Sequence, residues 1–256
     1  MIQWLSGTET ELIIYKPATM KYSSILLLSL LTFSSCKKEL PVGWIDQNRL
    51  MNREAKDWLS VGGNVMQQHY SPLDKINRSN VSELGFAWEY DARNTIGRIP
   101  KGLEATPIVV DGIMFTSGAW GFVYALDAKT GKELWKYDPK VDATYLRRAC
   151  CDAVNRGVAV WMGKVYVGTL DGYLVCLDAK NGAEIWRKDT FTDRTKAYTI
   201  TSPPQVAGSI VMIGNSGGEY GVRGYITAYD LQSGEQKWRF FIVPGDTKNG
   251  FENEEM

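Results

Sequence analysis

Several residue types and patterns are scarce in this chain of 256 residues. It contains one histidine, His69, with no matching metal-ligand partners, which argues against a zinc site and leaves His69 a structural role. Lys and Arg together number 29, as do Asp and Glu, and no basic stretch is present, so nothing indicates a nucleic-acid partner. The apolar run Ile25–Phe33 is too short to cross a bilayer as a helix.

Two cofactor signatures are also missing from the printed sequence. The covalent haem motif Cys-x-x-Cys-His is absent, so we expect any haem-bearing electron acceptor to be another domain or another protein. Gly218, Gly221 and Gly224 do not have the spacing of the nicotinamide-binding fingerprint, and no βαβ pattern surrounds them. A nicotinamide-dependent enzyme is therefore disfavoured.

What the chain does contain is a repeat. The segments 126–135, 177–186 and 229–238 each carry Asp, Gly and Trp at the same spacing, and the copies recur about every fifty residues. This period is typical of β-propeller blades, and a large ring at a fixed position in each blade packs against the next blade. We therefore assign Trp135, Trp186 and Trp238 a structural role.

Each repeat resolves into four short strands separated by turn residues, of which Asp111-Gly112 is a strong hairpin signal. The expected strands are 106–110, 113–117, 122–127 and 133–136 in the first unit, 157–160, 164–169, 173–178 and 184–188 in the second, and 202–206, 209–214, 224–230 and 236–241 in the third. An earlier strand, Phe86–Tyr90, carries Trp88 without preceding strands of its own. The sequence thus predicts an all-β fold of four-stranded propeller blades.

The N-terminal region resembles an export signal. Residues 1–19 precede a plausible start at Met20 and are expected to be a disordered or peripheral extension. Within the segment 20–36, Met20-Lys21 opens a positive region, an apolar core follows, and small residues precede Cys36. This ending resembles the lipobox of bacterial lipoproteins, which makes Cys36 a candidate for lipidation; an ordinary cleaved signal is the alternative.

Beyond the signal, residues 37–56 are expected to form a polar tether and a short helix. Residues 46–59 have helical composition, and Asp46 is the candidate N-cap. The propeller domain is expected over residues 57–256.

Two adjacent cysteines, Cys150 and Cys151, stand in the run 148–157, Arg-Ala-Cys-Cys-Asp-Ala-Val-Asn-Arg-Gly. If joined, they close a very small ring whose strain is usually found at a functional site; the alternative is two neighbouring core thiols. Export to an oxidising compartment would remove the main objection to the bond. Cys176, in the predicted strand 173–178, is expected to be an inert core thiol.

Taken with the blades and the export signal, these motifs resemble the pyrroloquinoline quinone (PQQ) dependent alcohol dehydrogenases, from about residue 57 to residue 255. The matches are the Cys-Cys run, Trp58, Gln68, Tyr70, 71–73, 76–77, 102–107 and 214–224. The resemblance implies an eight-bladed propeller, of which this chain is an incomplete arc, with PQQ in a central funnel beside Ca²⁺ under a vicinal disulfide. It implies oxidation of small alcohols to aldehydes in the periplasm, with electrons passed to a cytochrome c or another acceptor.

The resemblance also assigns residues. Cys150 and Cys151 would form the disulfide, which lies over one face of the quinone. Glu104, Arg156 and Thr201 would hold cofactor oxygens, with Thr199 a neighbouring alternative to Thr201. Residues 216–218, which are Ser216, Gly217 and Gly218, would approach PQQ through their backbone, and Glu219 would be a calcium ligand.

In the family, a further metal ligand and the general base come from a segment expected beyond residue 256, so we expect these residues alone to be inactive. A different class remains open: a lipid-anchored propeller scaffold resembling the outer-membrane assembly lipoproteins. That reading explains the signal, Cys36 and the repeated Trp, but leaves Glu104, Arg156 and Glu219 without a role.

Overall fold

The computed structural model describes residues 39–92, 102–246 and 248. The expected extension 1–19 and the signal segment 20–36, with Cys36, lie outside the described residues. Among those that are described, no helix is both long and apolar enough to cross a membrane.

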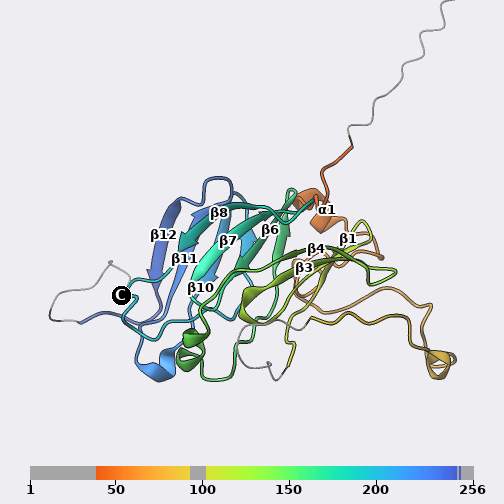
Figure 1. The fold of residues 1–256 in the computed structure, drawn as a ribbon. Coiled ribbons are helices and arrows are strands. Elements are labelled where there is room, and N and C mark those ends of the chain that lie inside the picture. Colours follow the sequence, from red (N-terminus) through yellow and green to blue (C-terminus); the bar gives the residue numbers. More distant parts are fainter. Residues whose placement is uncertain (1–38, 93–101, 247, 249–256) are drawn as a thin grey trace, which may run out of the picture. The chain divides into compact units, whose positions relative to one another are not determined.

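Three four-stranded antiparallel sheets form the fold, and in each the strands pair in sequence order (Figure 1). Sheet 1 comprises β1 (Ile108–Val110), β2 (Ile113–Ser117), β3 (Val123–Asp127) and β4 (Glu133–Tyr137). Sheet 2 comprises β5 (Ala159–Trp161), β6 (Lys164–Gly168), β7 (Tyr173–Asp178) and β8 (Glu184–Asp189). Sheet 3 comprises β9 (Gln205–Ala207), β10 (Ile210–Gly214), β11 (Tyr225–Asp230) and β12 (Gln236–Phe241). The predicted all-β blades are confirmed.

The hairpin at Asp111-Gly112 follows the expected turn chemistry. Both residues have positive φ, 52° and 75°, as a tight two-residue turn between antiparallel strands requires. The turn sets Val110 opposite Ile113 at the start of the β1–β2 register.

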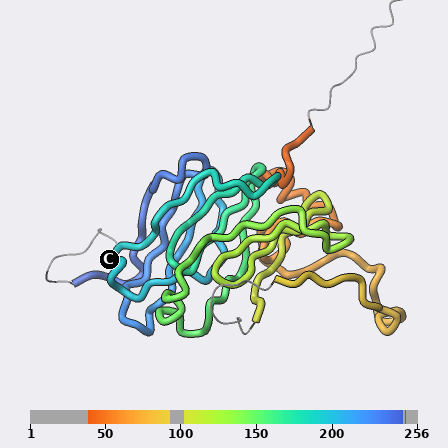
Figure 2. The backbone as a smooth tube through the Cα atoms, in the orientation of Figure 1, coloured from red at the N-terminus to blue at the C-terminus, as the bar shows by residue number. Residues whose placement is uncertain are grey.

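The middle sheet is buried on both faces, because side chains alternate along a strand. In β7, Val175 and Leu177 join an apolar cluster with sheet 1, whereas Leu174 and Cys176 join a second cluster with sheet 3. All four are fully buried. Consecutive sheets are thus joined face to face by apolar packing, and Figure 2 shows them following one another along the chain.

The repeated Trp and Gly meet across neighbouring sheets. Each Trp ring lies on the glycine of the following repeat, where a Cβ atom would stand only 2.4–2.8 Å from the ring. The three pairs are Trp88 on Gly131, Trp135 on Gly182 and Trp186 on Gly234. The structural role predicted for Trp135 and Trp186 is confirmed; Trp238, in the final strand described, is 42% exposed.

The predicted strand Phe86–Tyr90 is wrong. These residues are irregular, because no neighbouring strand supplies backbone hydrogen bonds to them among the described residues. Side chains hold the segment instead: Trp88 and Tyr90 pack against the cluster around Tyr124, and the Tyr90 hydroxyl donates to Glu133.

Five short helices lie among the described residues, and one of them was expected. Asp46 caps α1 (Gln47–Met51) by accepting from the Arg49 N–H at 2.8 Å, as predicted. The helix ends at Met51 rather than near residue 59, since the Trp58 backbone pairs with Val109 of β1. The others are η1 (Val81–Glu83), η2 (Ala119–Gly121), η3 (Ala143–Arg148) and η4 (Gly218–Tyr220).

The expected polar tether before this helix is also corrected. Ile45 is fully buried in the cluster between sheets 1 and 2, and its carbonyl accepts from the Met162 N–H at 2.9 Å. Gly43 lies so close to Ala179 that a Cβ atom would approach within 2.8 Å. The end of this segment is therefore part of the packed unit.

Candidate functional site

Cys150 and Cys151 are joined by a disulfide, so the alternative of two separate core thiols is wrong. The pair follows η3 directly, and both residues are exposed. The next residue, Asp152, has a φ of 92°, and its carboxylate accepts from the Ala153 N–H at 2.9 Å. Cys176, by contrast, is a fully buried free thiol, and burial raises its pKa to about 12, as expected for an inert core residue.

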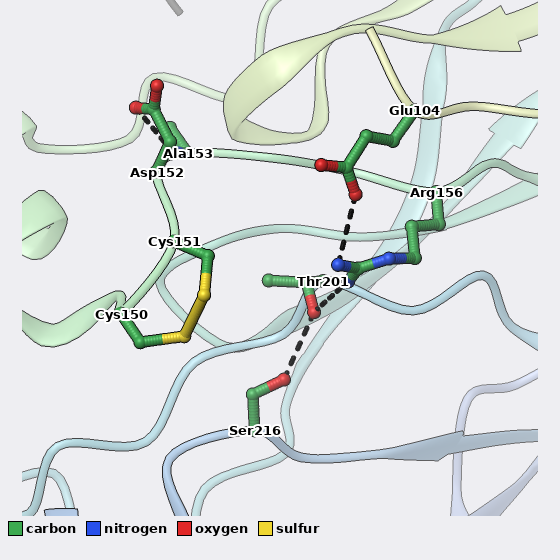
Figure 3. Close-up of a disulfide and its surroundings, with 8 residues drawn as sticks. All are labelled: Glu104, Cys150, Cys151, Asp152, Ala153, Arg156, Thr201 and Ser216. Carbon is green, nitrogen blue, oxygen red and sulfur yellow. Dashed lines mark hydrogen bonds and ion pairs between the residues drawn. A yellow bond between two sulfur atoms is a disulfide. The ribbon is translucent and has the colours of Figure 1, made fainter. Parts of the chain in front are cut away.

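A row of polar side chains faces the disulfide (Figure 3). Arg156 pairs with Glu104, with Nη2 3.0 Å from Oε2, and donates from Nη1 to the Thr201 hydroxyl at 2.7 Å. The Thr201 hydroxyl lies 3.1 Å from that of Ser216. The Arg156 and Glu104 side chains are 45% and 42% exposed, so the pair remains open to a ligand.

The disulfide and the polar side chains of Arg156, Thr201 and Ser216 line one small cavity of about 50 Å³. Its walls are Ala149, Cys150, Cys151, Asp152, Val154, Arg156, Thr199, Thr201, Ser216 and Glu219. The structure thus gathers residues separated by up to 70 positions in the chain, and Glu104 reaches the same site through Arg156. Thr199 also lines the cavity, but it is the Thr201 hydroxyl that bonds to Arg156.

Backbone pairing between the sheets explains why these residues meet. Thr106, just before β1, forms a parallel bridge with Gly157, and the Arg156 N–H donates to the Thr201 carbonyl at 3.0 Å. Thr199 in turn forms an antiparallel bridge with Ser216. The first strand of each sheet is shorter than predicted. The residues before β1 and β5 form backbone contacts with the segment that precedes the next sheet, whereas Thr199, before β9, pairs with Ser216 in the β10–β11 loop of its own sheet.

Asn155 stands in the Cys-Cys run and supports the site from behind, although the sequence alone gave it no role. It is 2% exposed, accepts from the Ser117 hydroxyl at 2.6 Å and donates to the Gly168 carbonyl at 2.7 Å. Its Oδ1 also accepts from the Gly157 N–H at 3.1 Å. This buried amide joins sheets 1 and 2 immediately beside Arg156, and its place in the Cys-Cys run was the available signal.

The loop before η4 forms another part of the wall. Gly217 has a φ of 112°, and a Cβ atom there would lie 2.4 Å from the Ala197 carbonyl oxygen, so a side chain is excluded. Gly218 faces open space, with no atom within 4 Å of the same position. Glu219 is exposed and lines the cavity, although the described residues contain no cluster of three metal-ligating side chains.

These donor groups suit a ligand that is rich in oxygen atoms and carries some negative charge. A guanidinium favours carboxylate oxygens through charge-assisted hydrogen bonds, and the Thr201 and Ser216 hydroxyls both donate and accept. The disulfide opposite offers an uncharged surface. Ligand pockets span roughly 300–1,000 Å³, so the cavity of about 50 Å³ is smaller than a typical pocket for such a ligand.

Comparison with known proteins agrees with this reading. The family model described as "Glucose/ethanol/alcohol dehydrogenase, beta-propeller domain", abbreviated PQQ, matches residues 58–256. The quinohemoprotein alcohol dehydrogenase ADH-IIG of Pseudomonas putida is 49% identical over 225 residues, which is 87% of this chain and 30% of the relative.

Two solved structures are also similar. The quinohemoprotein alcohol dehydrogenase of Comamonas testosteroni superposes with a TM-score of 0.78 at 49% identity, over 84% of this chain and 32% of the other. A europium-containing methanol dehydrogenase has a TM-score of 0.71 at 37% identity, covering 78% and 34% of the two chains. The chain thus spans about a third of the length of these proteins.

Proposed function

Because this chain belongs to the family of PQQ-dependent alcohol dehydrogenases, we propose that its parent protein oxidises small alcohols to aldehydes with bound PQQ. The observation that carries the proposal is the cavity between the Cys150–Cys151 disulfide and Arg156. An outer-surface position for these residues would have left the resemblance without a site.

The residues present fit one face and one edge of such a cofactor. PQQ is a flat molecule with three carboxylates, and it supplies the two-electron redox step when bound. Arg156, paired with Glu104 and Thr201, would hold a carboxylate or carbonyl oxygen at the edge. The disulfide would cover one face and exclude water, while Gly218 leaves room for backbone approach.

We further propose that Glu219 supplies one carboxylate ligand to Ca²⁺ beside the quinone. Calcium requires six to eight oxygen ligands, so other groups of the complete protein must contribute. Glu219 is exposed on the cavity wall, where a carboxylate can reach an ion. The europium in the methanol dehydrogenase structure supports an oxygen-liganded metal ion in this family.

The electron acceptor is proposed to be a cytochrome c or a haem domain, as the quinohemoprotein names of the relatives suggest. We also propose a periplasmic location with a lipid anchor at Cys36, which palmitate labelling and a C36S variant would test. Residues 1–256 alone are proposed not to turn over alcohol.

Cofactor binding tests the main proposal. The full-length protein should bind PQQ in the presence of Ca²⁺, measured by fluorescence quenching, and EDTA should weaken binding. R156M should raise the Kd about 10- to 100-fold, because charge-assisted hydrogen bonds are lost, whereas R147M, on the exposed side of η3, should leave it unchanged. No binding by the unaltered protein would instead favour the lipid-anchored scaffold.

A further inference from the structure

An arginine two residues before the disulfide connects this part of the chain to a distant loop. Arg148 ends η3, two residues before Cys150, and its Nη1 donates to the carbonyls of Arg194 at 2.9 Å and Lys196 at 3.0 Å. The guanidinium also lies over the Tyr145 ring, 5.0 Å from the centroid. The last turn of η3 is thereby tied to a loop more than 40 residues away in the chain.

The loop that receives Arg148 is itself fixed to sheet 2. Arg194 pairs with Asp189 at 2.6 Å, stacks over Tyr173 at 4.5 Å and donates to the Asp171 carbonyl at 3.2 Å. Its Nη1 also donates back to the Tyr145 hydroxyl at 3.0 Å. Arg148 and Arg194 therefore form a reciprocal connection between η3 and this loop, which we call the arginine clasp.

The clasp joins the two sides of the cavity. On one side, Arg148 is separated from the disulfide by Ala149 alone. On the other side, Lys196 precedes Thr199 and Thr201 of the cavity wall by a few residues in the chain. Neither Arg148 nor Arg194 lines the cavity. Their contacts therefore connect the chain segments on the two sides of the cavity without forming part of its wall.

Apolar packing holds the rest of η3 independently. Leu146 and Ala149 pack against the buried cluster that contains Trp120 and Phe122. Loss of the Arg148 contacts should therefore loosen the disulfide segment, which Ala149 still anchors on one side, without unfolding the sheets.

We propose that Arg148 is a positioning residue that fixes the Cys150–Cys151 disulfide as one wall of the cofactor cavity. The inference rests on the proposed function only in naming the ligand of that cavity. The effect on the disulfide is a property of the chain itself and is measured without PQQ.

The test is the rate at which dithiothreitol reduces the disulfide. Two electrons and two protons pass from the dithiol to the two sulfurs, giving two thiols and the cyclic disulfide of the reagent, and alkylation followed by peptide mass spectrometry counts the product. In the full chain, R148A should be reduced about tenfold faster, because a disulfide released from the Arg148 contacts more often adopts the alignment that thiolate attack requires. R147A, the exposed neighbour in the same helix, is the matched control and should stay within twofold of the unaltered rate.

A conservative variant separates positioning from a general loss of structure. R148K keeps a cation able to donate to the two carbonyls, so its rate should lie near that of the unaltered protein. The urea midpoint of unfolding should be the same for R148K, R147A and the unaltered protein. If R148A fails to fold, R148Q, which loses the charge but keeps an amide donor, should show an intermediate increase.

Reduction of R148A or R148Q at the unaltered rate would overturn the proposal, as would equal acceleration by R147A. If PQQ fails to bind the unaltered protein while the reduction rates follow the expected order, the clasp stands and only the proposed function fails.

Discussion

The contact between Trp135 and Gly182 gives a quantitative test of how the sheets dock. An Ala Cβ atom at Gly182 would lie 2.6 Å from the Trp135 ring, whose Nε1 donates to the Ala179 carbonyl at 3.0 Å. Gly182 also has a φ of +72°. G182A therefore combines about 1 kcal/mol of backbone strain with about 1–3 kcal/mol of overpacking.

Gly112 isolates the packing contribution. Its φ is +75°, but no atom lies within 4 Å of the position that a Cβ would occupy, so G112A should cost about 1 kcal/mol from backbone strain alone. For a protein of this size about 1 kcal/mol shifts Tm by about 2–4 °C. Thermal unfolding followed by circular dichroism should show a loss of about 4–16 °C for G182A and about 2–4 °C for G112A. Equal losses would refute the claim that the Trp ring on the repeat glycine orders neighbouring sheets.

Three further predictions concern ionisable groups. R49M should lower the free energy of unfolding by about 3–5 kcal/mol in urea titrations, because the Asp57 carboxylate, 1% exposed, loses its ion-pair partner. D111N should lower it by less than about 1 kcal/mol, because the Asp111 side chain is 51% exposed. Maleimide at pH 8 should not modify Cys176 in the native protein, because burial of this side chain raises its thiol pKa to about 12. Rapid labelling would contradict this. Burial raises the pKa of Asp171, so its contribution to stability falls as pH rises above about 4, and D171N should remove this decline from urea midpoints measured between pH 4 and 7.

Local signals in the sequence were enough to predict the sheets. The hairpin at Asp111-Gly112 and the spacing of Asp, Gly and Trp depend on residues close together in the chain, and β2, β7 and β12 match the predicted bounds. The prediction failed where pairing is long-range. Phe86–Tyr90 has strand composition but no paired neighbour among the described residues, and Ile45 reads as part of a polar segment although it is buried between two sheets.

The site shows the same division. Cys150, Cys151 and Arg156 were identifiable because they stand in one short motif, and Glu104 and Ser216 because each lies in a further family motif, whereas Thr201 lies outside the quoted motifs. That the disulfide, Arg156, Thr201 and Ser216 line one cavity, with Glu104 paired to Arg156, depends on long-range backbone pairing, which no local pattern encodes. Arg148 and Asn155 stand in the same run as the two cysteines but were given no role, because a local pattern does not show which distant carbonyls their side chains reach.

Adjacent cysteines lie close together even in the unfolded chain, whereas the other residues that line this cavity come together only when the chain folds. The sulfur pair precedes Thr201 and Ser216 in the chain by 50 residues or more, and domains form from the N-terminal end onward. Oxidation of Cys150 and Cys151 is therefore independent of sheet 3, whereas the opposing wall has to wait for it. If the protein binds PQQ as we propose, binding must follow both events, and bound quinone would then report completed maturation.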